Sequence, residues 1–223
     1  MGKKYEGLCF FEPWIGKNYD NGGIFNKKIL VLGESHICGS KRCNGKCGFK
    51  DFPGGCKPNF TTITVRNYLN PKKERDNWMR TYLKFERSLV GYETSTEDSK
   101  AIWNSIAFYN YLQVAMNESR TAGTYQDYID AQAPFLEVLG ELQPDLVIVW
   151  GVTRLFNSMP EDSWEWGEPL SFKDYPSFYI QNGSYKLKSG KITRVVPVYH
   201  PSVGYDWSWW HDEVIEKFVQ LKK

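Results

Sequence analysis

Apolar residues form four short continuous runs along the chain, each bounded by glycine or polar residues. Short runs rich in β-branched and aromatic side chains are typical of strands that are buried on both faces of a parallel sheet. The pattern therefore predicts strands over residues 27–32, 106–111, 146–151 and 195–199.

Between the strands, the apolar spacing changes to that of amphipathic helices. Residues 61–90 predict helices with a break near Pro71, and residues 99–104 predict the end of another helix. Residues 134–142 predict a further helix, and residues 209–221 predict an amphipathic C-terminal helix. Its apolar face would carry Val214, Ile215, Phe218 and Leu221.

Two segments in the C-terminal third of the chain are expected to form a loop and a hairpin. Residues 160–176 are acidic and aromatic and predict a surface loop. Residues 177–188, around Asn182-Gly183, predict a hairpin, because an Asn-Gly pair favours the tight turn between two strands.

Strands that alternate with helices predict a three-layer α/β/α sandwich with a central, mostly parallel sheet. The 223 residues suffice for one such domain and are few for two. We therefore expect a single domain over residues 1–223, with a Gly- and Cys-rich insertion at about 36–60. In such folds, ligands bind at the carboxyl ends of the strands.

Polar motifs follow three of the predicted strands. Gly33-Glu34-Ser35-His36 follows the first strand, Asn110 lies at the end of the second, and Tyr199-His200-Pro201-Ser202 follows the last. A carboxylate, an amide that both donates and accepts, and an imidazole that donates to a developing anion are useful groups in a nucleotide-cleaving site. Each residue taken alone is more typical of an ordinary loop, so the prediction depends on their joint placement.

The order and spacing of these motifs resemble the uracil-DNA glycosylase superfamily. Its members have a Gly-acid/Asn-x-Pro loop after a strand, an Asn-bearing strand, a strand of three apolar residues followed by Gly, and a terminal His-Pro-Ser. The matching segments here are residues 30–36, 108–110, 147–151 and 200–202. The resemblance implies a uracil-DNA glycosylase-like fold and a hydrolase that cuts the N-glycosidic bond of a flipped base in DNA.

The resemblance also implies roles for single residues. Glu34 would orient water or stabilise the sugar cation, and His200 would donate to the carbonyl oxygen of the departing base. The implied substrate-binding residues are Gly33, Ser35, His36, Phe60, Asn110 and Ser202, with Phe60 as the aromatic ring under the flipped base and Asn110 as its reader. Tyr205 or Trp207 would lie in the loop that wedges into the duplex.

The chain departs from the superfamily pattern at Ser35-His36, where Pro or Pro-Gly is usual. This departure leaves a modified pyrimidine, as in phage DNA, as an alternative substrate to uracil, and leaves repair or phage defence as the setting. His36 itself is a candidate metal ligand, second catalytic group or polar surface residue. Two other functions remain open: a catalytically silent DNA-binding module that senses damaged or modified bases, and a hydrolase of free nucleosides or nucleotides.

The uneven charge of the chain favours DNA as a partner. Residues 36–87 contain twelve basic and four acidic residues, a net charge of +8, which leaves −6 for the rest. Such segregation is typical of a nucleic-acid-facing side, although a charge run is also common on plain surfaces. Lys41 and Arg42 are the expected DNA contacts within this segment, and the excess of aromatic residues offers rings for base stacking.

The cysteines of the insertion form a dense cluster. Cys38, Cys43, Cys47 and Cys56 could hold a structural zinc ion, which catalysis would not require. The alternatives are no metal, or an iron-sulfur cluster, whose cysteines lie elsewhere in the superfamily. Cys9 is isolated. No apolar leader or membrane-length segment is present, so we expect a cytoplasmic, monomeric protein that does not enter a membrane.

Overall fold

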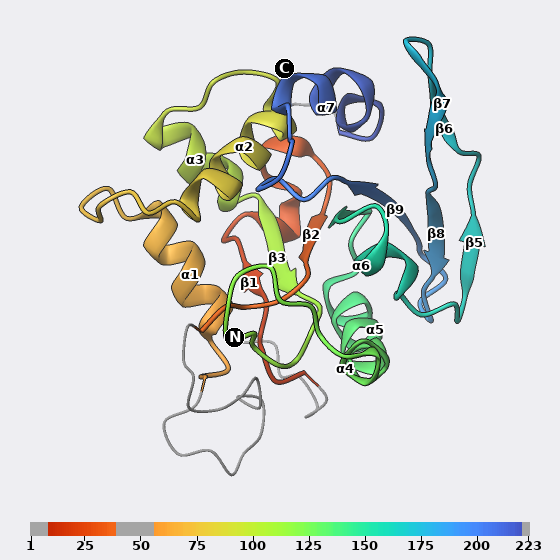
Figure 1. Ribbon diagram of the computed structural model, residues 1–223, viewed down its shortest axis with the longest axis horizontal. Coiled ribbons are helices and arrows are strands. Elements are labelled where there is room, and N and C mark those ends of the chain that lie inside the picture. The colour runs from red at the N-terminus through yellow and green to blue at the C-terminus, as the bar shows by residue number, and fades with distance from the viewer. Residues whose placement is uncertain (1–8, 39–55, 220–223) are drawn as a thin grey trace.

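The computed structural model describes residues 9–38 and 56–219 (Figure 1). Seven strands form one sheet in the order β1-β3-β2-β4-β9-β8-β5. The four central strands run parallel: β3 (Ile106–Asn110), β2 (Ile29–Gly33), β4 (Leu146–Trp150) and β9 (Ile192–Val198). The outer strands are antiparallel to their neighbours: β1 (Trp14–Ile15), β8 (Gly183–Lys186) and β5 (Trp164–Trp166). The four predicted strands are confirmed.

Helices cover both faces of the sheet, because alternate side chains of the buried strands point to opposite sides. Ile29 and Val31 of β2 enter one core with Phe85, whereas Leu30 enters the other. The first face carries α1 (Phe60–Leu69), α2 (Met79–Val90), α3 (Thr96–Trp103) and α7 (Trp207–Glu213). The second carries α4 (Tyr125–Asp130), α5 (Gln132–Leu142) and α6 (Arg154–Asn157). The protein is therefore an α/β sandwich.

The helix boundaries follow local sequence signals. The predicted break near Pro71 separates α1 from α2, and α2 ends at Gly91, which has the left-handed φ of +79°. Ser95 begins α3 with a reciprocal pair of hydrogen bonds to Asp98, a capping box that satisfies two backbone N–H groups at the helix start. This cap sets the residue at which α3 begins, and therefore where the loop between α2 and α3 ends.

The region of residues 160–188 differs from the prediction. It forms a long two-stranded arm rather than a loop followed by a hairpin: β5 continues into β6 (Leu170–Phe172), and β7 (Tyr175–Ile180) returns into β8 (Figure 1). The turn of the arm lies between β6 and β7, not at Asn182-Gly183. Asn182 instead bridges the arm, since its carbonyl accepts from Gly167 and its amide donates to Glu168.

The C-terminal helix is shorter than predicted. Helix α7 ends at Glu213, and a 3-10 turn (Ile215–Lys217) follows. Val214 and Ile215 are buried, as the amphipathic pattern predicted, whereas Leu221 lies outside the described residues. Within the described ranges, no helix combines the length and apolar character needed to cross a bilayer.

Candidate functional site

A cavity of about 500 Å³ opens at the carboxyl ends of the central strands. Strand β3 lies on one side of β2 and β4 on the other, so the loops that follow β2 and β4 leave the sheet in opposite directions. Such a switch point is where ligands bind in open α/β sheets. The predicted site residues that line this cavity are Gly33, Glu34, Ser35, His36, Phe60, Asn110 and His200.

Glu34 follows β2, and its carboxylate is held by two partners. Arg154 donates from Nε to Oε1 at 2.6 Å and from Nη2 to Oε2 at 2.7 Å, and the hydroxyl of Tyr128 also donates to Oε1. The Glu34 side chain is 18% exposed and that of Arg154 is 53% exposed. Burial raises the pKa of Glu34, but the hydrogen bonds from Arg154 and Tyr128 outweigh burial and lower it. Glu34 is therefore ionised at neutral pH.

Sequence reasoning missed Arg154 and Tyr128. The only available signal was the position of Arg154, four residues after Trp150, where the strand ends. Gly151 has a φ of +148°, a conformation that L side chains rarely adopt, and this turn leads directly into α6 and places Arg154. Tyr128 comes from α4, and nothing in its sequence neighbourhood indicates the contact with Glu34.

His200 follows β9 and presents an imidazole to the same cavity. Its Nδ1 lies 2.7 Å from Oγ of Ser202 and accepts the Ser202 backbone N–H at 3.3 Å. Accepting at Nδ1 places the proton of the neutral ring on Nε2, which leaves an N–H donor for a ligand. Burial lowers the pKa of His200 more than the nearby Glu34 carboxylate raises it, so the ring is neutral at pH 7.

Asn110 lies opposite Gly33 in the parallel register of β2 and β3. A Cβ atom on Gly33 would lie 2.3 Å from Oδ1 of Asn110, so only glycine lets the amide pack against this strand. The Nδ2 atom of Asn110 lies 3.0 Å from Nδ1 of His36. The amide that was expected to read a base is thus engaged by a neighbouring imidazole.

His36 fills the space beside Phe60. The two rings are stacked, with centroids 4.4 Å apart and planes 9° apart, and Nε2 of His36 lies 3.0 Å from Oγ1 of Thr61. His36 is 4% exposed, and burial lowers its pKa to about 3. This neutral imidazole makes the stacking and amide contacts that the sequence analysis assigned to a flipped base.

Trp150, at the end of β4, is a further cavity residue that sequence reasoning missed. It is almost fully buried, and its Nε1 has no hydrogen-bond partner among the described residues. Its ring meets that of His200 edge to face at 5.8 Å. Trp150 therefore contributes its ring, rather than an exposed N–H, to the wall of the cavity beside His200.

Of the other residues expected to contact DNA, the two that the structure describes, Tyr205 and Trp207, do not line the cavity. The structure buries Tyr205, which was expected to wedge into a duplex: it is 4% exposed, stacks on Trp210 and shares a hydrogen bond with Ser88. Trp207 begins α7 and packs half-buried against the core. Lys41 and Arg42 lie outside the described residues.

The two described cysteines of the insertion lie against the same hydrophobic cluster. Cys38 and Cys56 both pack against a small cluster of Phe11 and Ala115, and Phe60 joins the same cluster. Cys43 and Cys47 lie outside the described residues, and the described part holds no group of three metal-ligating side chains. Zinc stays a prediction: elemental analysis of purified protein is expected to find about one zinc ion per chain, and a metal-free, stably folded protein would contradict it.

Comparison with models of known protein families and with curated protein sequences gives no match to this chain.

Proposed function

We propose that the protein is a DNA glycosylase that hydrolyses the N-glycosidic bond of a uracil or modified pyrimidine flipped out of DNA. One observation carries the proposal: Glu34, Phe60, Asn110 and His200 come from separate parts of the chain and line one cavity. The resemblance to the uracil-DNA glycosylase superfamily depends on the same residues, and the α/β sandwich agrees with it.

The charge states of the two proposed catalytic residues suit this reaction. Breaking the glycosidic bond leaves its electron pair on the base and positive charge on the sugar. The ionised carboxylate of Glu34 would stabilise the sugar cation, and the neutral imidazole of His200 would donate from Nε2 to the base oxygen that gains negative charge. Water then adds its hydroxyl to the sugar carbon, and its remaining proton neutralises the departed base.

The partners of Glu34 define its part in this scheme. Both carboxylate oxygens already accept hydrogen bonds, from Arg154 and Tyr128, and the low pKa makes the group a weak base. Glu34 therefore suits electrostatic stabilisation of the cation better than proton abstraction from water. Its ionised state at neutral pH is what that role requires.

His36 governs access to the base position. A base can stack on the same face of Phe60 only after the His36 ring has turned away, which would also free the amide of Asn110. The ring of Trp150 lines the same cavity and supplies an aromatic wall beside His200.

Single-turnover excision assays test the proposal on single- and double-stranded oligonucleotides that contain uracil or a 5-substituted pyrimidine. We expect wild-type protein to release at least one of these bases. Glu34→Gln and His200→Ala should each slow release by about 100-fold or more while DNA affinity stays within a few-fold. Glu165→Gln, an exposed residue of β5, is the matched control. Release of none of the bases by wild-type protein would contradict the proposal.

A catalytically silent DNA-binding module is the second candidate. The observation that favours it is that the site residues already have partners within the protein. Arg154 pairs with Glu34, and His36 stacks on Phe60 and contacts the amide of Asn110. Such a module would bind modified DNA without releasing a base, and Glu34→Gln would leave its binding unchanged. The same set of assays separates the two candidates.

A further inference from the structure

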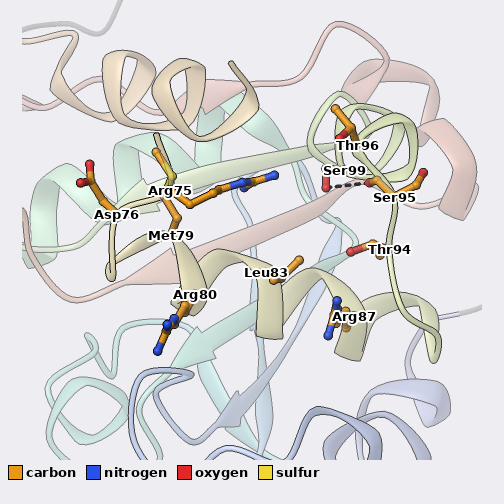
Figure 2. A pocket seen from close by; sticks show the side chains of 10 residues that line it. All are labelled: Arg75, Asp76, Met79, Arg80, Leu83, Arg87, Thr94, Ser95, Thr96 and Ser99. Atoms are coloured by element: carbon orange, nitrogen blue, oxygen red, sulfur yellow. Dashed lines mark hydrogen bonds between the residues drawn. The ribbon is translucent and has the colours of Figure 1, made fainter. Parts of the chain in front are cut away.

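We propose that a second cavity, between α2 and the start of α3, binds a small phosphomonoester. This cavity has a volume of about 410 Å³, and it shares no lining residue with the cavity at the strand ends. Figure 2 shows the side chains that line it. Helix α2 divides the two, because Trp78, Thr81 and Tyr82 line the first cavity and Met79 and Leu83 line the second. The remaining lining residues of the second cavity are Arg75, Asp76, Arg80, Arg87, Thr94, Ser95, Thr96 and Ser99.

The cavity is positively charged. Three arginines line it against a single carboxylate, that of Asp76. The Asp76 carboxylate is already engaged, since it accepts from the indole of Trp78 at 3.1 Å and lies 3.7 Å from Nζ of Lys73. Figure 2 shows Arg75 extending along the cavity toward Ser99, whereas Asp76 and Arg80 point outward. The charge inside the cavity therefore comes from Arg75 and Arg87.

The donors of these two arginines lack good partners. Within residues 9–38 and 56–219, Arg75 forms no ion pair, and its guanidinium lies 5.5 Å over the ring of Tyr68. Nε of Arg87 is buried with no hydrogen-bond partner in the same ranges. Its Nη1 only reaches Glu93 at 3.5 Å, and Glu93 is 77% exposed, so water weakens that pair. Both arginines thus line the cavity without a strong carboxylate partner, and such guanidinium groups favour an anionic ligand.

The nearest buried carboxylate does not fill this role. Glu86 lies behind the wall of the cavity, fully buried, and accepts from the hydroxyls of Thr94 and Ser99 and the indole of Trp103. Burial raises the pKa of Glu86, although the hydrogen-bond donors around it act in the opposite direction. In the described part of the chain it forms no ion pair with an arginine, so the two guanidinium groups stay available.

The shape and lining of the cavity indicate the class of ligand. Guanidinium forks match phosphate oxygens in pairs, and the hydroxyl of Thr96 adds a polar group to the rim. Met79 and Leu83 supply apolar contacts for the organic part of the ligand. The volume lies at the lower end of the range for small-molecule sites, so the ligand is of the size of a sugar phosphate. The inference does not depend on the proposed glycosylase activity.

Calorimetric titration of the full-length protein tests the inference with inorganic phosphate, ribose 5-phosphate and ribose. We expect ribose 5-phosphate to bind, phosphate to compete with it, and ribose not to bind. Arg75→Ala should weaken ribose 5-phosphate binding by about ten-fold or more, since a charge-assisted hydrogen bond is lost. Arg87→Lys keeps the charge, removes the fork and should weaken binding too. Arg66→Ala, an exposed arginine of α1 outside both cavities, is the control and should bind like wild type.

Three results would overturn the inference: equal affinity of Arg75→Ala and wild type, equal binding of ribose and ribose 5-phosphate, or no binding of any phosphomonoester. A DNA backbone phosphate is the other source of the same chemistry. An oligonucleotide without terminal phosphates distinguishes it, because Arg75-dependent binding of that oligonucleotide without binding of ribose 5-phosphate would assign the arginines to DNA and reject the small-molecule site.

Discussion

Glu34 and His200 line the same cavity, and both side chains are partly buried. At neutral pH, however, Glu34 is ionised and His200 is neutral. Burial disfavours the charged form of each group. For Glu34, the hydrogen bonds from Arg154 and Tyr128 outweigh burial and lower the pKa. For His200, the attraction of the Glu34 carboxylate does not offset burial, so the pKa lies below its ordinary value. The ion pair with Arg154 is therefore the contact that separates the two protonation states.

Removal of Arg154 should raise the pKa of Glu34. In Arg154→Ala, burial still raises this pKa while the strongest opposing hydrogen bonds are gone. The carboxyl carbon signal of Glu34, followed by NMR from pH 3 to 8, should titrate at a higher pH than in wild type. If base excision is found, the acidic limb of kcat/KM should move in the same direction. Arg194→Ala, an exposed residue on β9, should not move the Glu34 signal, and an unshifted signal in Arg154→Ala would contradict the assignment.

The buried imidazole of His36 should make the folded protein sensitive to acid. The unfolded chain binds a proton on this ring near its ordinary pKa of 6.5, whereas the folded chain binds it only near about 3. Between these values the unfolded state holds more protons, so the free energy of unfolding falls as the pH is lowered. The slope is at most about 1.4 kcal/mol per pH unit.

Urea denaturation of wild type and His36→Gln at pH 7, 6, 5 and 4 measures this effect. The free energy of unfolding of wild type minus that of the variant should decrease toward acid pH. His200 is present in both proteins, so the difference isolates His36. A difference that stays constant over this range would show that His36 is accessible to protons in the folded state.

At the scale of elements, the close approach of β2 and β3 depends on Gly33. A Cβ atom there would lie 2.3 Å from Oδ1 of Asn110 and 3.0 Å from the ring of Phe108, both within the buried sheet. We expect Gly33→Ala to lower the free energy of unfolding by about 1–3 kcal/mol, because a packed strand pair cannot absorb the extra atom without strain.

Gly140 of α5 offers the opposite case for the same substitution. A Cβ atom there meets nothing within 4 Å, and alanine is the better helix former. Gly140→Ala should therefore raise the free energy of unfolding by about 0.5–1 kcal/mol. Chemical denaturation of both variants provides the measurement, and a Gly33→Ala protein as stable as Gly140→Ala would show that β2 and β3 can separate locally.

The elements that sequence predicted are those whose signal is local. Strand β4 is apolar throughout because it is buried on both faces, and α2 begins after a polar, proline-containing break. The arm formed by β5 to β8 has no such signal, since its strands are short and partly exposed and so lack a continuous apolar run. The burial of Tyr205 could not be predicted either, because its packing on Trp210 depends on how α7 packs against α2.

The candidate site shows the same limit. Glu34, Asn110 and His200 could be found because each follows a strand, and the sheet brings strand ends together whatever the details of packing. Arg154 and Tyr128 could not be found as partners of Glu34, because their contacts depend on where α6 and α4 dock. Likewise, the sequence offers no signal that His36 stacks on Phe60.

At the scale of the whole molecule, the basic segment and the cavity at the strand ends coincide in part. Residues 36–87 carry a net charge of +8, and this segment contributes His36, Phe60 and Lys73 to the lining of that cavity. Lys73 is a basic side chain of this segment that lines the cavity, so it would attract a negatively charged polymer toward the proposed base position. This placement gives a prediction that does not require catalysis.

DNA binding should depend steeply on salt, and Lys73 should account for about one unit of that dependence. Each neutralised phosphate contributes about 0.7–0.9 to the slope of the logarithm of affinity against the logarithm of salt concentration. Lys73→Ala should reduce the slope by about that amount and weaken binding equally for all sequences, because a phosphate contact carries no base information. Fluorescence anisotropy from 50 to 300 mM NaCl measures both effects. Lys186→Ala on β8 removes the same charge from a strand that contributes no residue to that cavity, and should leave the slope unchanged. Equal loss of slope in the two variants would mean that overall charge alone attracts DNA, and the basic segment would no longer mark the side that binds it.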